Sequence, residues 1–207
     1  MQGRGKCVAG MQPELPARRE YVAAFLEIAR RISASLQGLP KKALPVHMYV
    51  AGGAALHFYT GERVTQDIDA AFSKRIALPD NLEVSYRDAD GAAQLLYLDR
   101  QYSDTLALIH ENAYDDSEPL ALPDLEPEIL DVRLLTPTDL AVTKIGRMTS
   151  QDRDDIAALA RRGLLSSASL RARAEEAVSN FVGDTIRLRG NIDSACRMVA
   201  DVESRCA

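Results

Sequence analysis

Tyr49-Val50-Ala51-Gly52-Gly53-Ala54-Ala55-Leu56 and, a short way further on, Thr65-Gln66-Asp67-Ile68-Asp69 carry most of the information on how this chain folds. The first stretch is a short apolar strand that runs into two glycines, which is typical of a buried strand turning into a helix. The second reads as a strand. Because a strand alternates its side chains between faces, both carboxylates point the same way while Ile68 points into the core.

The chemistry of these two stretches favours phosphate handling. Hard divalent ions such as Mg²⁺ take a few carboxylate oxygens and leave their other positions to water and to substrate phosphate. A glycine turn lets backbone N–H groups approach such phosphates, and here Gly52, Gly53 and Ala54 would provide them at the start of a helix. Ala54 stands where a serine is common, so only backbone amides can serve. Phosphoryl or nucleotidyl transfer is the first hypothesis, whereas a lone Asp-x-Asp pair on an exposed strand would mean little.

Composition limits the other function classes. The 207 residues are 46% hydrophobic and 27% charged, which suits a globular core rather than disorder. A formal net charge of −5 argues against a broadly basic nucleic-acid surface, although a local patch around Lys144, Arg147 and Arg153 remains possible. No apolar run of about 18 residues and no secretory signal is visible, so we expect a cytoplasmic protein without a membrane span. The cysteines lack metal-ligand spacing and read as reduced thiols: Cys7, Cys196 and Cys206.

The pattern along the chain predicts an α+β fold: a small mixed β-sheet core with flanking helices, followed by a C-terminal helical segment. We expect a mobile leader over residues 1–16, an α/β core over 17–135 and helices from 136 to 207 that close a cleft. Helical spacing predicts helices over 18–37, from about Gly53, from Thr136, over 151–163, 167–181 and 184–204. Strands are expected at 47–50, 67–72, 82–86, 94–99 and 129–132, with a loop containing a short strand between 114 and 128.

The helix after the last strand has a strong start signal and carries two cations. Thr136 fits the N-cap, Pro137 the first helical position and Asp139 the capping-box position. Lys144 and Arg147 are one turn apart on this expected helix, either as solvated cations or as phosphate contacts. Asp152, Asp154 and Asp155 start the next helix, where carboxylates suit the helix dipole without further function.

Three stretches together resemble the minimal nucleotidyltransferases of the DNA polymerase beta superfamily: 52–69, 134–147 and 151–156. The chain is similar to a DUF6036-like bacterial group of unassigned function, related to abortive-infection toxins of the AbiEii type. The resemblance covers roughly residues 45–190, and it lies in the combination of these short motifs.

That resemblance implies two Mg²⁺ ions held by Asp67, Asp69 and a third carboxylate on an adjacent strand, with an NTP as substrate. Asp99, which ends an apolar strand, is the first choice for the third ligand; Asp131 is the alternative and Asp104 a weaker one. The resemblance also makes Lys144 a triphosphate contact, helped by Arg147, with Asp155 supporting either cation by a salt bridge.

The implied activity is transfer of a nucleoside monophosphate to an acceptor hydroxyl on RNA, for example tRNA, or on protein. The implied setting is a toxin–antitoxin or phage-defence system, with a possible cognate antitoxin as partner. The competing hypothesis is a catalytically degenerate nucleotide-binding or antitoxin-type interaction module, favoured by Ala54 and by the open choice of third carboxylate. Arg63 and Thr65 could line the cleft or stabilise the turn, and lone His110 reads as a satisfied, partly buried histidine.

Overall fold

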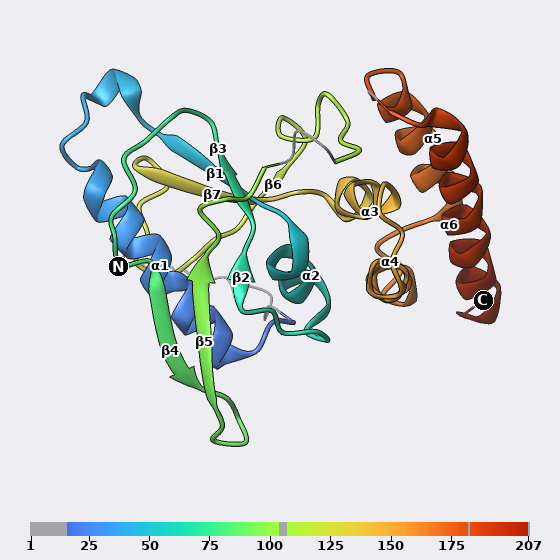
Figure 1. Cartoon of the computed structure of the whole chain (residues 1–207). Helices are drawn as coiled ribbons and strands as arrows, with labels where there is room; N and C mark the ends of the chain where they lie inside the picture. The colour runs from blue at the N-terminus through green and yellow to red at the C-terminus, as the bar shows by residue number, and fades with distance from the viewer. Residues whose placement is uncertain (1–15, 104–106, 182, 207) are drawn as a thin grey trace, which may run out of the picture.

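The computed structural model describes residues 16–103, 107–181 and 183–206, and these form the mixed α and β arrangement in Figure 1. The described residues up to Leu134 hold the strands and two helices, with a 3-10 turn at Lys41–Ala43. The helices are α1 (Arg19–Leu36), α2 (Gly52–Thr60), α3 (Pro137–Ile145), α4 (Ser150–Arg161), α5 (Ser167–Val178) and α6 (Thr185–Cys206). The expected α+β class is therefore confirmed.

The first sheet contains four strands in the order β3, β1, β7, β6. Its central strands, β1 (Val46–Val50) and β7 (Leu130–Leu134), run parallel in register, and both alternate between fully buried and partly exposed residues. Short β3 (Ala70–Phe72) and β6 (Glu118–Pro119) pair antiparallel with them at either side. Because β1 and β7 are parallel, they end at the same edge of the sheet, where α2 follows β1 and α3 follows β7.

The second sheet has three strands in the order β2, β5, β4. β5 (Ala93–Leu98) lies between β4 (Glu83–Arg87), its hairpin partner, and the two-residue β2 (Asp67–Ile68), with which it runs parallel. The expected single strand over 67–72 is thus wrong in one respect: it is divided at Asp69. The carbonyl of Ile68 accepts from Asp99 N–H at 3.0 Å, whereas the carbonyl of Asp69 accepts from Ala51 N–H at 2.9 Å. Consecutive residues therefore bond to different sheets.

Helix α1 covers the inner face of both sheets. Its apolar positions recur at helical spacing and are completely buried, among them Phe25, Ile28 and Ile32. It packs against β4, β5 and β7, and Figure 1 shows it behind the β4–β5 hairpin. The opposite face of the second sheet is consequently left uncovered by this helix.

The last four helices pack on one another and against α2. Thr136 caps α3 by accepting the N–H of Asp139 at 3.1 Å, with Pro137 at the first helical position, as the sequence predicts. Figure 1 shows these helices on the opposite side of α2 from the β4–β5 hairpin. Among the described residues, no helix is long and apolar enough to cross a membrane.

Other sequence predictions have separate outcomes. His110 is buried, and its ring nitrogens lie 3.1 Å from Glu176 and 3.1 Å from the donating N–H of Asn112, as expected of a satisfied histidine. Cys196 is a buried free thiol. Cys7, Asp104 and all but Pro16 of the expected leader lie outside the described residues, as does the side chain of Cys206. The division into a core and a helical segment at 135 and 136 stays a prediction.

Candidate active site

The glycine pair opens α2 directly after β1. Gly52 has a φ of +58°, and a Cβ at this position would overlap the Asp69 carboxylate. A Cβ on Gly53 would lie 2.8 Å from Nη2 of Arg63 and 2.9 Å from Cβ of Thr65. The other side chains of the site therefore touch the turn itself, and this close approach explains why both positions need glycine.

Helix α2 begins with backbone N–H groups that no helix carbonyl can accept. The N–H of Ala55 donates to the carbonyl of Ala51 at 3.1 Å, and no side chain caps the helix. The preceding N–H groups lie at the positive end of the helix dipole, where an anion is stabilised. The side chain of Ala54 is completely buried in the core, so its predicted contact to nucleotide can come only from its N–H.

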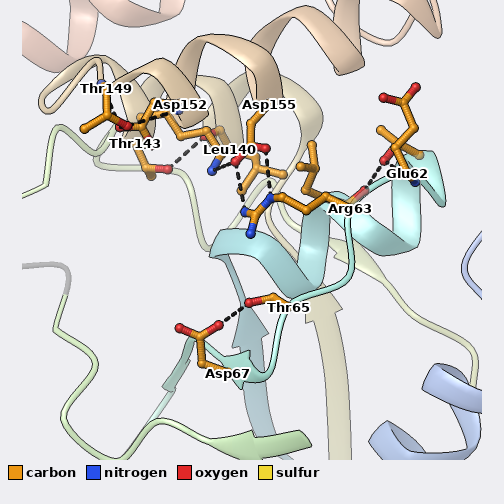
Figure 2. A network of polar contacts seen from close by, with 12 residues as sticks. Glu62, Arg63, Thr65, Asp67, Leu140, Thr143, Thr149, Asp152 and Asp155 are labelled. Carbon is orange, nitrogen blue, oxygen red and sulfur yellow. Dashed lines mark hydrogen bonds and ion pairs between the residues drawn. The ribbon is translucent and has the colours of Figure 1, made fainter. Parts of the chain in front are cut away.

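Asp67 and Asp69 line one cavity together with the glycine pair. Asp67 accepts a hydrogen bond from the hydroxyl of Thr65, a contact drawn in Figure 2. Burial, followed by the negative charges of Asp67 and Asp99, raises the pKa of Asp69 to about 6, and cations across the cavity offset this only in part. The site thus concentrates negative charge at a half-buried carboxyl, which favours binding of either a proton or a cation.

The two candidates for a third carboxylate lie in different places. Asp99 directly follows β5, beside Ile68 of β2, and is close enough to Asp69 to raise its pKa. Asp131 lies within β7, where its Oδ2 is 2.9 Å from Nδ1 of His47 and accepts from Arg133 at 3.1 Å. Neither residue lines the cavity, and Asp99 is the one whose charge acts on Asp69, so the choice of Asp99 over Asp131 stays a prediction. No group of three or more His, Cys, Asp or Glu in the described ranges is arranged to hold a metal ion.

A network of charges lies opposite these carboxylates. Lys144 is only 3% exposed, and its Nζ donates to Oδ2 of Asp155 at 2.7 Å. Arg63 donates to both oxygens of the same carboxylate, at 3.1 and 3.0 Å, and Figure 2 shows its guanidinium directed at Asp155. Asp155 thus forms a salt bridge to Lys144, and its supporting role in the site stays a prediction. Arg63, in contrast, was left open by the sequence between lining the cleft and stabilising a turn.

Arg147 differs from its predicted position. It was expected one turn after Lys144 on the same helix, but α3 ends at Ile145 and Arg147 lies in the connection to α4. The helix stops there because Thr149 and Asp152 form the capping box that starts α4. Arg147 is mostly exposed and donates to Asp152 at 3.0 Å rather than to Asp155. Arg147 nevertheless lines the cavity, next to Asp152, to which it is bonded.

These residues surround a polar cavity of about 340 Å³. We call Thr65, Asp67 and Asp69 its acidic wall, and Arg63, Lys144 and Arg147 with the carboxylates of Asp152 and Asp155 its basic wall. The complete lining is Gly52, Gly53, Arg63, Thr65, Asp67, Asp69, Lys144, Arg147, Thr149, Gln151, Asp152 and Asp155. A smaller cavity, near Tyr21 and Gln94, lies outside this constellation.

The chemistry of the two walls defines a class of protein. Hard carboxylate oxygens beside free amides at a helix start, facing Lys and Arg, form the kind of site that holds a phosphorylated ligand together with a divalent cation. Residues 27–189 match the family model described as "Nucleotidyltransferase of unknown function (DUF6036)", and the chain therefore belongs to this family. Neither the curated proteins nor the solved structures yield a match. The predicted relation of this family to abortive-infection toxins of the AbiEii type stays a prediction.

Proposed function

We propose that this nucleotidyltransferase is Mg²⁺-dependent and moves a nucleoside monophosphate from an NTP to an acceptor hydroxyl. The observation that carries the proposal is the opposition of the two walls across one cavity, with the glycine turn between them. Family membership supports the general activity, and the residues of the cavity support the finer chemistry.

The acidic wall fits Mg²⁺ by its donor chemistry. In phosphate-binding sites Mg²⁺ is held by one or two carboxylates, with water and phosphate oxygens in the remaining positions. Asp67 and Asp69 supply such donors, and Asp99 is near enough to influence them. A bound ion would neutralise phosphate charge and lower the pKa of the acceptor hydroxyl. Burial raises the pKa of Asp69 most, and the negative charges of Asp67 and Asp99, which raise it further, also favour a cation at this position.

The chain's own residues have separate tasks around the triphosphate. Free N–H groups at the start of α2 bind phosphate oxygens, and the missing Cβ of Gly52 lets the Asp69 carboxylate lie beside this helix start. Lys144 and Arg63 stabilise the negative charge that develops on the departing pyrophosphate. Asp155 is a positioning residue, because its carboxylate bonds to both cations.

A binding module without catalysis is the second candidate. It is favoured by the absence, among the described residues, of a preassembled group of three ligands. In that case the cavity would still bind nucleotide. In a toxin–antitoxin system, the chain would then act as the antitoxin-type partner and not as the toxin. The two candidates differ in one measurable property, which is transfer of label from an NTP.

The test is incubation of the purified chain with Mg²⁺, each α-labelled NTP in turn, and total RNA or cell extract. We expect label on an acceptor, and a loss of at least ~10³-fold in the Asp67→Asn/Asp69→Asn variant, because both metal donors lose their charge. Asp90→Asn/Asp201→Asn removes the same net charge at two exposed positions and serves as the matched control. Transfer that survives in the first variant would overturn the mechanism, and no transfer in the natural chain would favour the binding module.

A further inference from the structure

Tyr97 is an exposed aromatic residue beside the acidic wall. It lies in β5 and is 38% exposed, one of the few large hydrophobic side chains at the surface of the described chain. The parallel pairing of β2 with β5 sets it directly opposite Asp67. Paired residues share a face, as do residues two apart on a strand, so Tyr97, Asp67 and Asp99 lie on the same face of the sheet.

This face is the one that α1 leaves uncovered. The residues that alternate with Tyr97, such as Leu96 and Leu98, are buried on the inner face with Ile68. On the outer face, Glu83, Ser85 and Arg87 of β4 are all exposed. The outer face of the second sheet therefore extends from Asp67 through Tyr97 to the exposed residues of β4.

If the proposed function holds, the in-line geometry of the reaction places the acceptor substrate on the side of the site where Tyr97 lies. In the proposed reaction the leaving pyrophosphate would be bound by Lys144 of α3 and by Arg63, both of which bond to Asp155 of α4. In nucleotidyl transfer the attacking and leaving oxygens are roughly in line through the reacting phosphorus. The acceptor oxygen must therefore approach from the side opposite the basic wall, and on that side lies the outer face of the second sheet, where β5 carries Tyr97. Figure 1 shows β5 and the helices α3 and α4 on opposite sides of β2.

We propose that Tyr97 binds the acceptor, and that this acceptor is the terminal nucleoside of a nucleic-acid strand whose base stacks on the phenol ring. In the step itself, the acceptor hydroxyl oxygen forms a bond to the α-phosphorus of the NTP, the bond to the bridging oxygen of pyrophosphate breaks, and the hydroxyl proton passes to solvent. Tyr97 takes no part in this exchange of bonds. It holds the nucleoside so that its hydroxyl faces Asp67 and Asp99.

The surroundings of Tyr97 favour a strand end over a protein segment. A flat ring offers stacking to any base, worth about 1–3 kcal/mol per base in other single-strand-binding proteins. Glu83, which pairs with Tyr97, and Asp67 repel phosphate close to the ring, so a terminal nucleoside fits there better than the middle of a strand. Ser85 and Arg87 follow on the same face, with Arg87 about 13 Å from the level of Tyr97 given the rise of a strand. A hydroxyl and a guanidinium at that distance suit the phosphates further along the strand.

The first experiment separates acceptor binding from NTP binding. We expect Tyr97→Ala to lower transfer to RNA by about 10- to 100-fold through a higher KM for the acceptor, while Tyr97→Phe keeps most of the activity because stacking needs only the ring. The affinity for a non-hydrolysable NTP with Mg²⁺ stays unchanged in both variants. A loss of NTP affinity in Tyr97→Ala, or unchanged KM for RNA, would overturn the proposal.

The second experiment needs no activity, so it remains decisive even if the proposed function fails. The chain has no tryptophan, and Tyr97→Trp therefore introduces a single reporter of stacking. A short single-stranded RNA with a free 3′ hydroxyl should quench its fluorescence, and should leave Ile186→Trp unaffected, because Ile186 is 85% exposed on the distant helix α6. Equal quenching of both variants, no quenching by RNA, or quenching by the NTP analogue alone would each contradict the proposal. Labelled protein in place of labelled RNA in the transfer assay would do so as well.

Discussion

The two walls of the cavity hold their charges in opposite ways. On the basic wall every cation has a carboxylate: Lys144 and Arg63 share Asp155, and Arg147 bonds to Asp152. The acidic wall contains two carboxylates close together, and the repulsion contributes to the raised pKa of Asp69. On the basic wall, each cation is compensated by a carboxylate of the chain. On the acidic wall, the negative charges of Asp67 and Asp69 would be compensated only by an added cation.

This difference indicates that the side chains of the basic wall are held in place by ion pairs, whereas the acidic wall has the affinity for a cation. Paired charges keep Lys144 in position although it is almost completely buried, so the proposed binding of phosphate would need little reorganisation. Unfavourable charge on the acidic wall costs stability, and a cation bound as proposed would relieve it. The following predictions test each wall separately.

The largest effect is expected from breaking the basic wall at Asp155. Asp155→Ala leaves Lys144 buried without a carboxylate, and loss of one partner of a buried pair costs about 3–5 kcal/mol. Urea unfolding of this variant should show a much lower midpoint. Asp154→Ala, at the exposed neighbouring position of the same helix, is the control and should change stability by less than about 0.5 kcal/mol. A double change, Lys144→Met/Asp155→Leu, should recover most of the loss; equal midpoints for the two single variants would show that the pair contributes nothing.

A smaller effect is expected where the glycine turn meets the acidic wall. Gly52→Ala places a Cβ against the Asp69 carboxylate at a positive φ, so we expect a loss of about 2–4 kcal/mol in unfolding free energy. Gly190→Ala is the matched control within α6, because a Cβ there meets nothing within 4 Å. This second change should stabilise the chain by up to about 1 kcal/mol, since alanine has the higher helix propensity. If Gly52→Ala melts at the temperature of the natural chain, the close approach of Asp69 is wrong.

The smallest effect measures the unfavourable charge of the acidic wall directly. Because the folded-state pKa of Asp69 is about 6 and its ordinary value is 3.8, the folded chain prefers the protonated carboxyl. Its contribution to stability is fully present below pH 4 and is lost as the pH rises through 6. The difference corresponds to at most ~3 kcal/mol, and solvent screening of this partly exposed group reduces the expectation to about 1–2 kcal/mol.

Asp69→Asn should therefore stabilise the chain in EDTA at pH 8, by about 1–2 kcal/mol, with the gain disappearing near pH 4. Added Mg²⁺ should raise the melting temperature of the natural chain more than that of the variant, because only the natural chain keeps both carboxylates. A variant that is less stable than the natural chain at pH 8 would contradict the description of this wall.

Local sequence patterns predicted most of the fold. The helices, the hairpin β4–β5 and the cap at Thr136 follow from periodicity and turn residues within short windows. The break at Asp69 could not be predicted in this way. It depends on the N–H groups of Ala51 and Asp99, which come from two different sheets and are distant in sequence.

The site was predictable where its chemistry is local. Asp67, Asp69 and the glycine pair are close in sequence, and the structure brings them to one cavity. Arg63 was undervalued because its partner, Asp155, lies 92 residues away. A usable signal was nevertheless present: Arg63, Thr65, Asp67 and Asp69 are polar at every second position, as expected of an extended segment with one face toward the site. Arg147 was placed on a helix because the end of α3 depends on the cap of α4.

The division of the expected strand at Asp69, between two sheets, has a mechanical consequence. Asp67 belongs to the strand that pairs with β5, while the backbone of Asp69 is bonded to the end of β1. The two carboxylates are therefore carried by two separately hydrogen-bonded sheets. An ion bound by both carboxylates would link the two sheets to each other. Loss of that ion would weaken the contact between the sheets.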